Sequence, residues 1–120
     1  MKTLLLIEDE ESLRASLRKM LTFEDYNVIV AEDGPSGVAH ARQHLPDLIL
    51  CDIMLPNLDG FGVAEALHSD PATAAIPLIF LTAKAEKEAI QRGMELGVSA
   101  YVTKPFTLNE ILDVINAHLP

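Results

Sequence analysis

Five short runs of apolar residues recur along this chain, each four or five residues long. Short, continuously apolar runs are typical of parallel strands that are buried on both faces. The runs are Thr3–Ile7, Val28–Ala31, Leu48–Cys51, Pro77–Leu81 and Ala100–Thr103. The pattern therefore predicts five strands at the centre of the fold.

A segment with helical spacing of apolar residues follows each run. The first helix has Leu13, Leu17 and Leu21 on one stripe. The last has the clearest stripe, formed by Leu108, Ile111, Leu112, Ile115 and Leu119. The three helices between them are expected at Pro35–Leu45, Gly60–Ser69 and Glu86–Leu96. Ile90 and Met94 give the helix at 86–96 only a thin apolar stripe, so we expect it to be loosely held.

Strict alternation of strands and helices predicts an open, doubly wound parallel sheet with helices on both faces. The length of 120 residues favours a single domain. In such sheets the functional crevice lies beyond the carboxyl ends of the strands. The polar residues that follow the runs are Glu8, Asp9, Asp52, Thr82 and Lys104. We therefore expect all five at one rim of the sheet.

Asp52 stands directly after the central apolar run, where a carboxylate is costly unless another group pairs with it. A loop containing Pro56 and Asn57 follows. Asp59 is then predicted to cap the helix that begins at Gly60.

The formal net charge of −9 argues against binding of nucleic acid phosphates, which requires a basic face. A single cysteine, Cys51, excludes an internal disulfide and a metal site with several cysteines. It is interpreted as a small buried strand residue. The apolar run Leu4–Ile7 is too short for an export signal or a membrane span, so a cytoplasmic protein without membrane contact is expected.

Four motifs taken together resemble the response-regulator receiver domain of two-component phosphorelay signalling. They are the acid pair Glu8-Asp9, Asp52 after the third strand, Thr82-Ala83 after the fourth, and Tyr101-x-x-Lys104-Pro105 across the fifth. The resemblance covers essentially the whole chain and implies a single receiver domain at residues 1–120. It also implies a flavodoxin-like α/β fold with strand order 2-1-3-4-5 and five helices.

The resemblance implies that Asp52 is the phosphoacceptor, taking a phosphoryl group from a histidine kinase or a histidine phosphotransfer protein. Catalysis then depends on positioning and charge neutralisation, for which Mg²⁺ is suited, and Mn²⁺ can substitute. The expected metal ligands are Asp9, Asp52 and the backbone carbonyl of Met54, with Glu8 bound through water. The domain is expected to catalyse only its own phosphorylation and dephosphorylation and is not otherwise an enzyme.

The remaining motif residues receive roles by the same resemblance. Lys104 is expected to pair with a phosphoryl oxygen, Thr82 to donate its hydroxyl to another, and the Ala83 N–H to approach the phosphoryl group. Thr82 and Tyr101 are the expected switch residues. The Lys104–Pro105 peptide bond is expected to be cis. Among the basic residues, Lys104 is the one cation expected near the three acids.

Phosphorylation is expected to change a partner-binding face formed by Glu86–Leu96, Ala100–Thr103 and the last helix. The output partner is unknown, and a monomer or weak dimer is expected. Ser99-Ala100 stand where receivers joined to winged-helix domains often have an Asp pair, and the last helix lacks Arg and Lys. This difference weakens a place in that dimerising subgroup. The chain either acts alone or was cut from a longer protein.

Other interpretations of the same residues remain open. Glu8 and Asp9 can cap the first helix, Asp52 and Lys104 can form a structural ion pair, and Thr82 can bond locally. A dehalogenase-type phosphatase also uses an Asp nucleophile, but its general acid lies two residues on, where this chain has Met54. An interaction module that is never phosphorylated predicts a broken site, whereas this site is complete.

Overall fold

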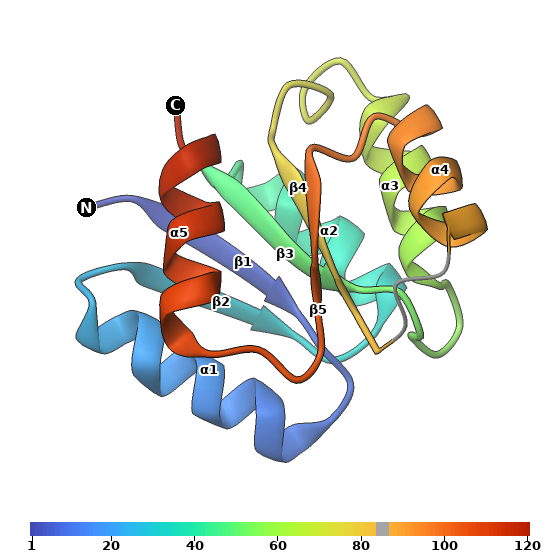
Figure 1. Cartoon of the computed structure of the whole chain (residues 1–120). Helices are drawn as coiled ribbons and strands as arrows, with labels where there is room; N and C mark the ends of the chain where they lie inside the picture. The colour runs from blue at the N-terminus through green and yellow to red at the C-terminus, as the bar shows by residue number, and fades with distance from the viewer. Residues whose placement is uncertain (84–86) are drawn as a thin grey trace.

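The computed structural model describes residues 1–83 and 87–120. Strands and helices alternate throughout, as the apolar pattern predicts (Figure 1). Their bounds are β1 Thr3–Ile7, α1 Glu11–Phe23, β2 Asn27–Ala31, α2 Gly34–His44, β3 Leu48–Asp52, α3 Gly60–His68, β4 Leu78–Thr82, α4 Lys87–Glu95, β5 Ala100–Thr103 and α5 Leu108–His118. The predicted start of the fourth helix, residue 86, lies outside the described residues.

The five strands form one parallel sheet in the order β2-β1-β3-β4-β5, which confirms the predicted topology. The register places Ile7 beside Cys51, and Asp52 beside Leu81. The carboxyl ends of neighbouring strands are therefore level with one another. β4 begins at Leu78 and not at the predicted Pro77, because proline has no N–H to donate to the ladder.

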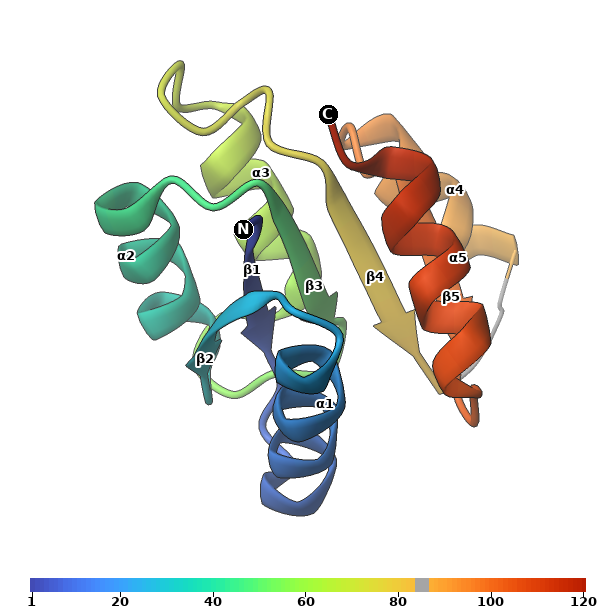
Figure 2. The same ribbon diagram turned by 90° about the vertical axis from the view of Figure 1, so that its left-hand side faces the viewer.

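Each face of the sheet buries its own hydrophobic core. One core contains Leu5, Ile7 and Ile49 and is covered by α2, α3 and α4. The other contains Leu4 and Leu6 and is covered by α1 and α5. Figures 1 and 2 show α1 and α5 on one side of the sheet and α2 and α3 on the other. Successive strand residues point to opposite faces, which explains why the strand sequences are apolar without alternation.

Helix α4 packs differently from its predicted stripe. Met94 is 51% exposed, and Gly93 is the buried residue of this helix. A Cβ atom at position 93 would lie 2.7 Å from the ring of Phe80, so the absence of a side chain allows the close approach. The guanidinium of Arg92 also lies over the ring of Phe61, 4.2 Å from its centroid. Among the described residues, the Gly93 contact, the partly buried Ala89 and the cation–π contact of Arg92 hold α4 against the fold.

None of the helices in the described ranges has the length and apolar character needed to cross a bilayer.

Candidate functional site

Polar side chains from four strands meet at the carboxyl rim of the sheet. Glu8 and Asp9 follow β1, Asp52 ends β3, Thr82 ends β4, and Lys104 follows β5. Carboxylate oxygens of Glu8, Asp9 and Asp52 all lie within 4.8 Å of one another. Within residues 1–83 and 87–120, no other group of three or more His, Cys, Asp or Glu side chains converges in this way. The structure thus brings the predicted acids together.

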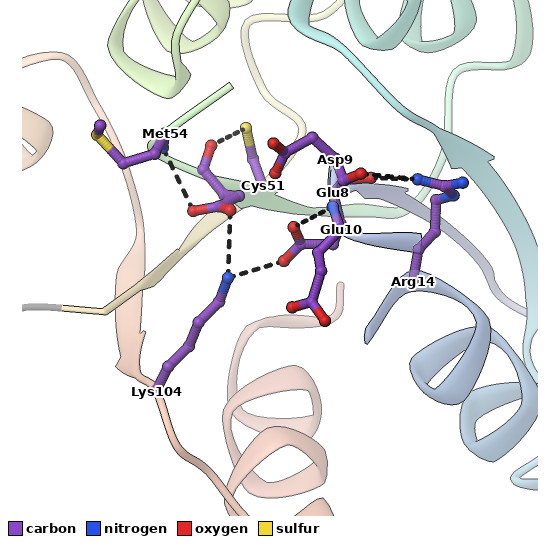
Figure 3. Close-up of polar contacts among 8 residues, drawn as sticks. Glu8, Asp9, Glu10, Arg14, Cys51, Met54 and Lys104 are labelled. Carbon is purple, nitrogen blue, oxygen red and sulfur yellow. Dashed lines mark hydrogen bonds and ion pairs between the residues drawn. The ribbon is translucent and has the colours of Figure 1, made fainter. Parts of the chain in front are cut away.

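Lys104 reaches across the rim to two of these acids (Figure 3). Its Nζ atom donates to Glu8 Oε1 at 2.8 Å and to Asp52 Oδ2 at 3.2 Å. Burial alone lowers the pKa of Lys104, but the hydrogen bond to Glu8 and the charge of Asp52 outweigh burial and raise that pKa. Lys104 is therefore an ammonium ion at neutral pH and offsets part of the acidic charge.

Glu8 is completely buried, and both of its carboxylate oxygens are engaged. Oε1 accepts from Lys104, and Oε2 accepts from the backbone N–H of Glu10 at 3.1 Å. Glu10 is the N-cap residue of α1, so Glu8 also helps to tie down the start of this helix. Because the carboxylate of Glu8 is completely buried, an indirect contact to a metal through water suits it better than direct coordination.

Asp9 differs from Glu8 in both burial and hydrogen bonding. Its side chain is exposed, and its carboxylate makes no hydrogen bond or ion pair with the described part of the chain. The carboxylate does not cap α1, so one half of the capping interpretation is wrong. Asp9 therefore offers unpaired anionic oxygens at the mouth of the site.

Local backbone geometry fixes Asp52. Its Oδ1 atom accepts from the backbone N–H of Met54 at 3.3 Å, and Lys104 holds Oδ2. Gly60 begins α3 so close behind that a Cβ atom there would lie 2.6 Å from the Asp52 carbonyl oxygen. The Asp59 side chain caps α3 by accepting from the Gly62 N–H at 2.9 Å, as predicted. Asp52 is 6% exposed, so its carboxylate opens only toward the rim.

The other motif residues lie on β4 and β5 or directly after these strands. Thr82 is buried at the end of β4, and its carbonyl oxygen accepts from the backbone N–H of Lys104 at 2.7 Å. Ala83 is exposed just beyond it. Tyr101 on β5 is 42% exposed, and the Lys104–Pro105 peptide bond is cis. Thr82 and Lys104 therefore stand at the same rim of the sheet as Asp52.

Cys51 lies directly behind this site, buried in the sheet. Burial raises the pKa of its thiol well above the ordinary value, and the charge of Asp52 raises that pKa further. The thiol is therefore uncharged and is a core group, as predicted.

Arg14 is a second cation beside the site, so the expectation that Lys104 is the one nearby cation is wrong. Arg14 Nη1 donates to the backbone carbonyls of Glu8 at 2.9 Å and Asp9 at 3.3 Å. Side-chain periodicity does not reveal a contact of this kind. The available signal is a cation near the start of α1, where the helix dipole favours acids.

The donor set fits a hard divalent cation. Mg²⁺ prefers oxygen ligands and is bound in proteins by one or two carboxylates together with water and phosphate oxygens. The rim supplies the exposed carboxylate of Asp9 and the rim-facing carboxylate of Asp52, with net negative charge beside them.

Fold and site together define a class of protein: a doubly wound α/β domain with an acidic, lysine-containing rim at the carboxyl ends of its strands. A model of the response regulator receiver domain family matches residues 4–116. The chain therefore belongs to the response regulator receiver domain family. Members of this family are phospho-accepting signalling domains of two-component systems and not conventional enzymes.

Relatives with similar sequences are response regulators. PleD of Caulobacter vibrioides is 41% identical over 102 residues, which are 85% of this chain and 22% of PleD. The transcriptional regulatory protein RprY of Bacteroides fragilis is 40% identical over 116 residues, which are 97% of this chain and 48% of RprY. ArlR of Staphylococcus aureus is 36% identical over 119 residues, which are 99% of this chain and 53% of ArlR. The chain thus spans about half, or less, of the length of these relatives.

Solved structures show the same fold. The chemotaxis protein CheY4 of Vibrio cholerae matches with a TM-score of 0.95 at 27% identity, covering 99% of both chains. The receiver domain of the sensor histidine kinase PA1611 from Pseudomonas aeruginosa matches with a TM-score of 0.91 at 28% identity, covering 98% of this chain and 96% of the other. That structure has a magnesium ion coordinated in its active site cleft.

Proposed function

We propose that this chain is a signalling switch in which Asp52 accepts a phosphoryl group from a histidine kinase or a histidine phosphotransfer protein. The proposal rests on one observation: three carboxylates converge within 4.8 Å, and Lys104 bonds two of them. Asp52 is the member that ends the central strand and faces the rim. Glu8 is completely buried, so its carboxylate is not accessible to an incoming donor.

In the proposed reaction, an oxygen of Asp52 forms a bond to phosphorus as the phosphorus–nitrogen bond of the donor phosphohistidine breaks. The bonding electrons return to the imidazole nitrogen, which takes up a proton from solvent, and an acyl phosphate remains on Asp52. Positioning and charge neutralisation are what the protein contributes to such a transfer. The hydrogen bonds from Met54 N–H and Lys104 fix the carboxylate before the donor arrives. Loss of the phosphoryl group to water restores the carboxylate.

Mg²⁺ is the proposed cofactor, and Mn²⁺ can replace it. Asp9, Asp52 and the backbone carbonyl of Met54 would hold the metal directly, and Glu8 would contact it through water. The exposed side chain of Asp9 and the completely buried carboxylate of Glu8 support this division. When bound, the metal supplies positive charge that offsets the repulsion between the acids and an incoming phosphoryl group.

Lys104, Thr82 and Ala83 are proposed to receive the phosphoryl oxygens. Lys104 would exchange its bond to Asp52 for one to a phosphoryl oxygen while keeping Glu8 as its second partner. The Thr82 hydroxyl and the Ala83 N–H would donate to the other oxygens. All three residues stand at the ends of β4 and β5 beside Asp52, which supports these roles.

The output of the switch is proposed to be the face formed by α4, β5 and α5, with Thr82 and Tyr101 as the residues that respond to phosphorylation. The exposed side chain of Tyr101 supports this choice, and so does the burial of Gly93 alone among the described residues of α4. The proposed unit is one receiver domain at residues 1–120, acting as a monomer or weak dimer. We propose that this chain itself contacts neither nucleic acid nor membranes.

Phosphorylation of the purified chain by a small phosphodonor tests the proposal. Intact mass should rise by one phosphoryl group in Mg²⁺ and remain unchanged in chelator. Asp52→Asn should abolish the adduct, whereas Asp113→Asn, which removes an exposed acid of α5, should leave it unchanged. An adduct on Asp52→Asn, or full labelling in chelator, would refute the assignment.

A further inference from the structure

Arg14 binds the backbone of the loop that carries two of the site acids. Its Nη1 atom donates to the carbonyl oxygens of Glu8 at 2.9 Å and Asp9 at 3.3 Å. In Figure 3, Arg14 and Lys104 lie on opposite sides of these acids. The side chain of Arg14 is only 18% exposed, so the contact is built into the fold and does not lie free on the surface.

The choice of partners is unusual for a cation placed beside three carboxylates. Among the described residues, the single carboxylate near its guanidinium is Glu32, at 4.0 Å and with a side chain that is 74% exposed. Such a pair contributes little. Arg14 therefore donates to two consecutive carbonyl oxygens and does not bond the carboxylate of Asp9.

As a result, the side chains of Glu8 and Asp9 are held in different directions. The Glu8 N–H is also held, donating to the Ala31 carbonyl oxygen at 3.0 Å. With the backbone held at these points, Glu8 turns inward to Lys104, and Asp9 remains at the mouth of the site. Loosening the loop would let either carboxylate leave its place.

We propose that Arg14 is a positioning residue for metal binding, which preorganises the loop of Glu8 and Asp9 through its carbonyls. This inference rests on the proposed function, because it assumes that the acid cluster binds Mg²⁺. Arg14 acts through the backbone and touches neither metal nor phosphoryl group.

The proposal predicts an effect opposite in sign to simple electrostatics. Removing a positive charge close to a cation site should tighten Mg²⁺ binding by Coulomb's law alone. Removing a clamp that orders the ligands should weaken it, and loss of such outer contacts typically costs about tenfold or more in metal affinity. The sign of the change therefore separates the two effects.

The experiment is calorimetric titration of the full chain with MgCl₂ at fixed ionic strength. Arg14→Gln should bind Mg²⁺ about tenfold more weakly than the parent. Arg14→Lys should lose less, because its ammonium can still reach one carbonyl. Lys19→Gln, an exposed charge on the same helix, and Glu32→Gln, which leaves the carbonyl contacts intact, should bind as the parent does.

Circular dichroism in chelator shows which variants are folded at the titration temperature. The Mg²⁺ affinities of fully folded variants can be compared directly, because a lower global stability does not alter them. Unchanged or tighter binding by Arg14→Gln overturns the proposal. If that variant does not fold, Arg14→Lys decides: weaker binding supports the clamp, and parental or tighter binding overturns it. If the parent chain itself fails to bind Mg²⁺, the proposed function falls, which is a different outcome from failure of the clamp.

Discussion

Replacing Lys104 with Met should strongly destabilise the metal-free protein. Lys104 is the cation that bonds the fully buried carboxylate of Glu8, at 2.8 Å, and it also bonds Asp52 at 3.2 Å. The Met side chain retains the apolar stem but not the ammonium group. Glu8 would then keep one hydrogen bond, from the Glu10 N–H, and no counter-charge among the contacts that the structure describes.

The size of the effect follows from burial. Removing one partner of a buried ion pair costs about 3–5 kcal/mol, because the other charge is left uncompensated. Glu8 is completely buried, but the side chain of Lys104 is 21% exposed and Glu8 keeps its second bond. The lower end of that range, about 3 kcal/mol, is therefore expected, which is roughly 10 °C in Tm for a domain of this size. Glu8→Gln combined with Lys104→Met should recover most of the loss.

Urea denaturation followed by circular dichroism in chelator measures this loss, with equal m-values required for the comparison. Lys19→Met is the matched control, and as an exposed change it should stay within about 0.5 kcal/mol of the parent. A loss no larger than that of the control would refute the reasoning. So would a double variant as unstable as Lys104→Met alone, because the cost would then not come from the stranded Glu8.

The pH dependence gives an independent check on the same ion pairs. The pKa of Lys104 is raised in the folded protein above its ordinary value of 10.5, mainly by the bond to Glu8 and the charge of Asp52 acting against burial. A raised lysine pKa contributes stability that is complete below the unfolded pKa and is lost as pH rises through the folded pKa. The part of the parent–Lys104→Met difference in unfolding free energy that comes from the Lys104 charge should therefore be constant from neutral pH to about pH 10.5 and narrow above it.

Two further predictions concern the metal and the output face. Asp9→Asn removes an exposed, unpaired carboxylate, so metal-free stability should rise by up to about 1 kcal/mol. Mg²⁺ at a hundredfold excess over Kd should raise the unfolding free energy of the parent by roughly 2.7 kcal/mol, and this stabilisation should largely vanish in Asp9→Asn. Urea melts with Mg²⁺ and with chelator measure both, and a less stable metal-free variant contradicts the idea. Hydrogen exchange with a phosphoryl analogue should change over α4, β5 and α5, and change confined to other elements would reject that face.

The positions of the strands could be predicted from the apolar pattern because burial on both faces leaves a simple signature. Their order was implied by the resemblance to receiver domains. The continuous apolar runs mark the sheet, and the residue after each run marks the rim, since parallel strands end level with one another. Turn chemistry helped in the same way, because a cap such as Asp59 acts within three residues of its position. For the strands and for this cap the determining interaction was periodic or local, and the expectation agreed with the structure.

The differences arise where the determining contact leaves no periodic trace. Gly93 carries no hydrophobic signal, yet its lack of a side chain lets α4 approach Phe80, and Met94 is turned outward. Arg14 acts on carbonyl oxygens, which every residue has, so no pattern of side chains marks its partners. The bond of Lys104 to Glu8 joins residues 96 positions apart and depends on how deeply Glu8 is buried.

These contacts explain how three acids can share one rim in a folded protein. Lys104 offsets charge on Glu8 and Asp52, while Arg14 holds the loop without taking a carboxylate oxygen from Asp9. The repulsion that remains is therefore concentrated at the exposed mouth, where solvent screens it and lowers its cost. If a base were paired with Asp9 instead, the repulsion between the acids would be reduced, but the oxygens that a cation requires would be occupied. At Asp9 the arrangement of hydrogen-bond partners thus favours metal binding over stability. A substitution at Asp9 should therefore change metal affinity and metal-free stability in opposite directions more clearly than one at the other acids.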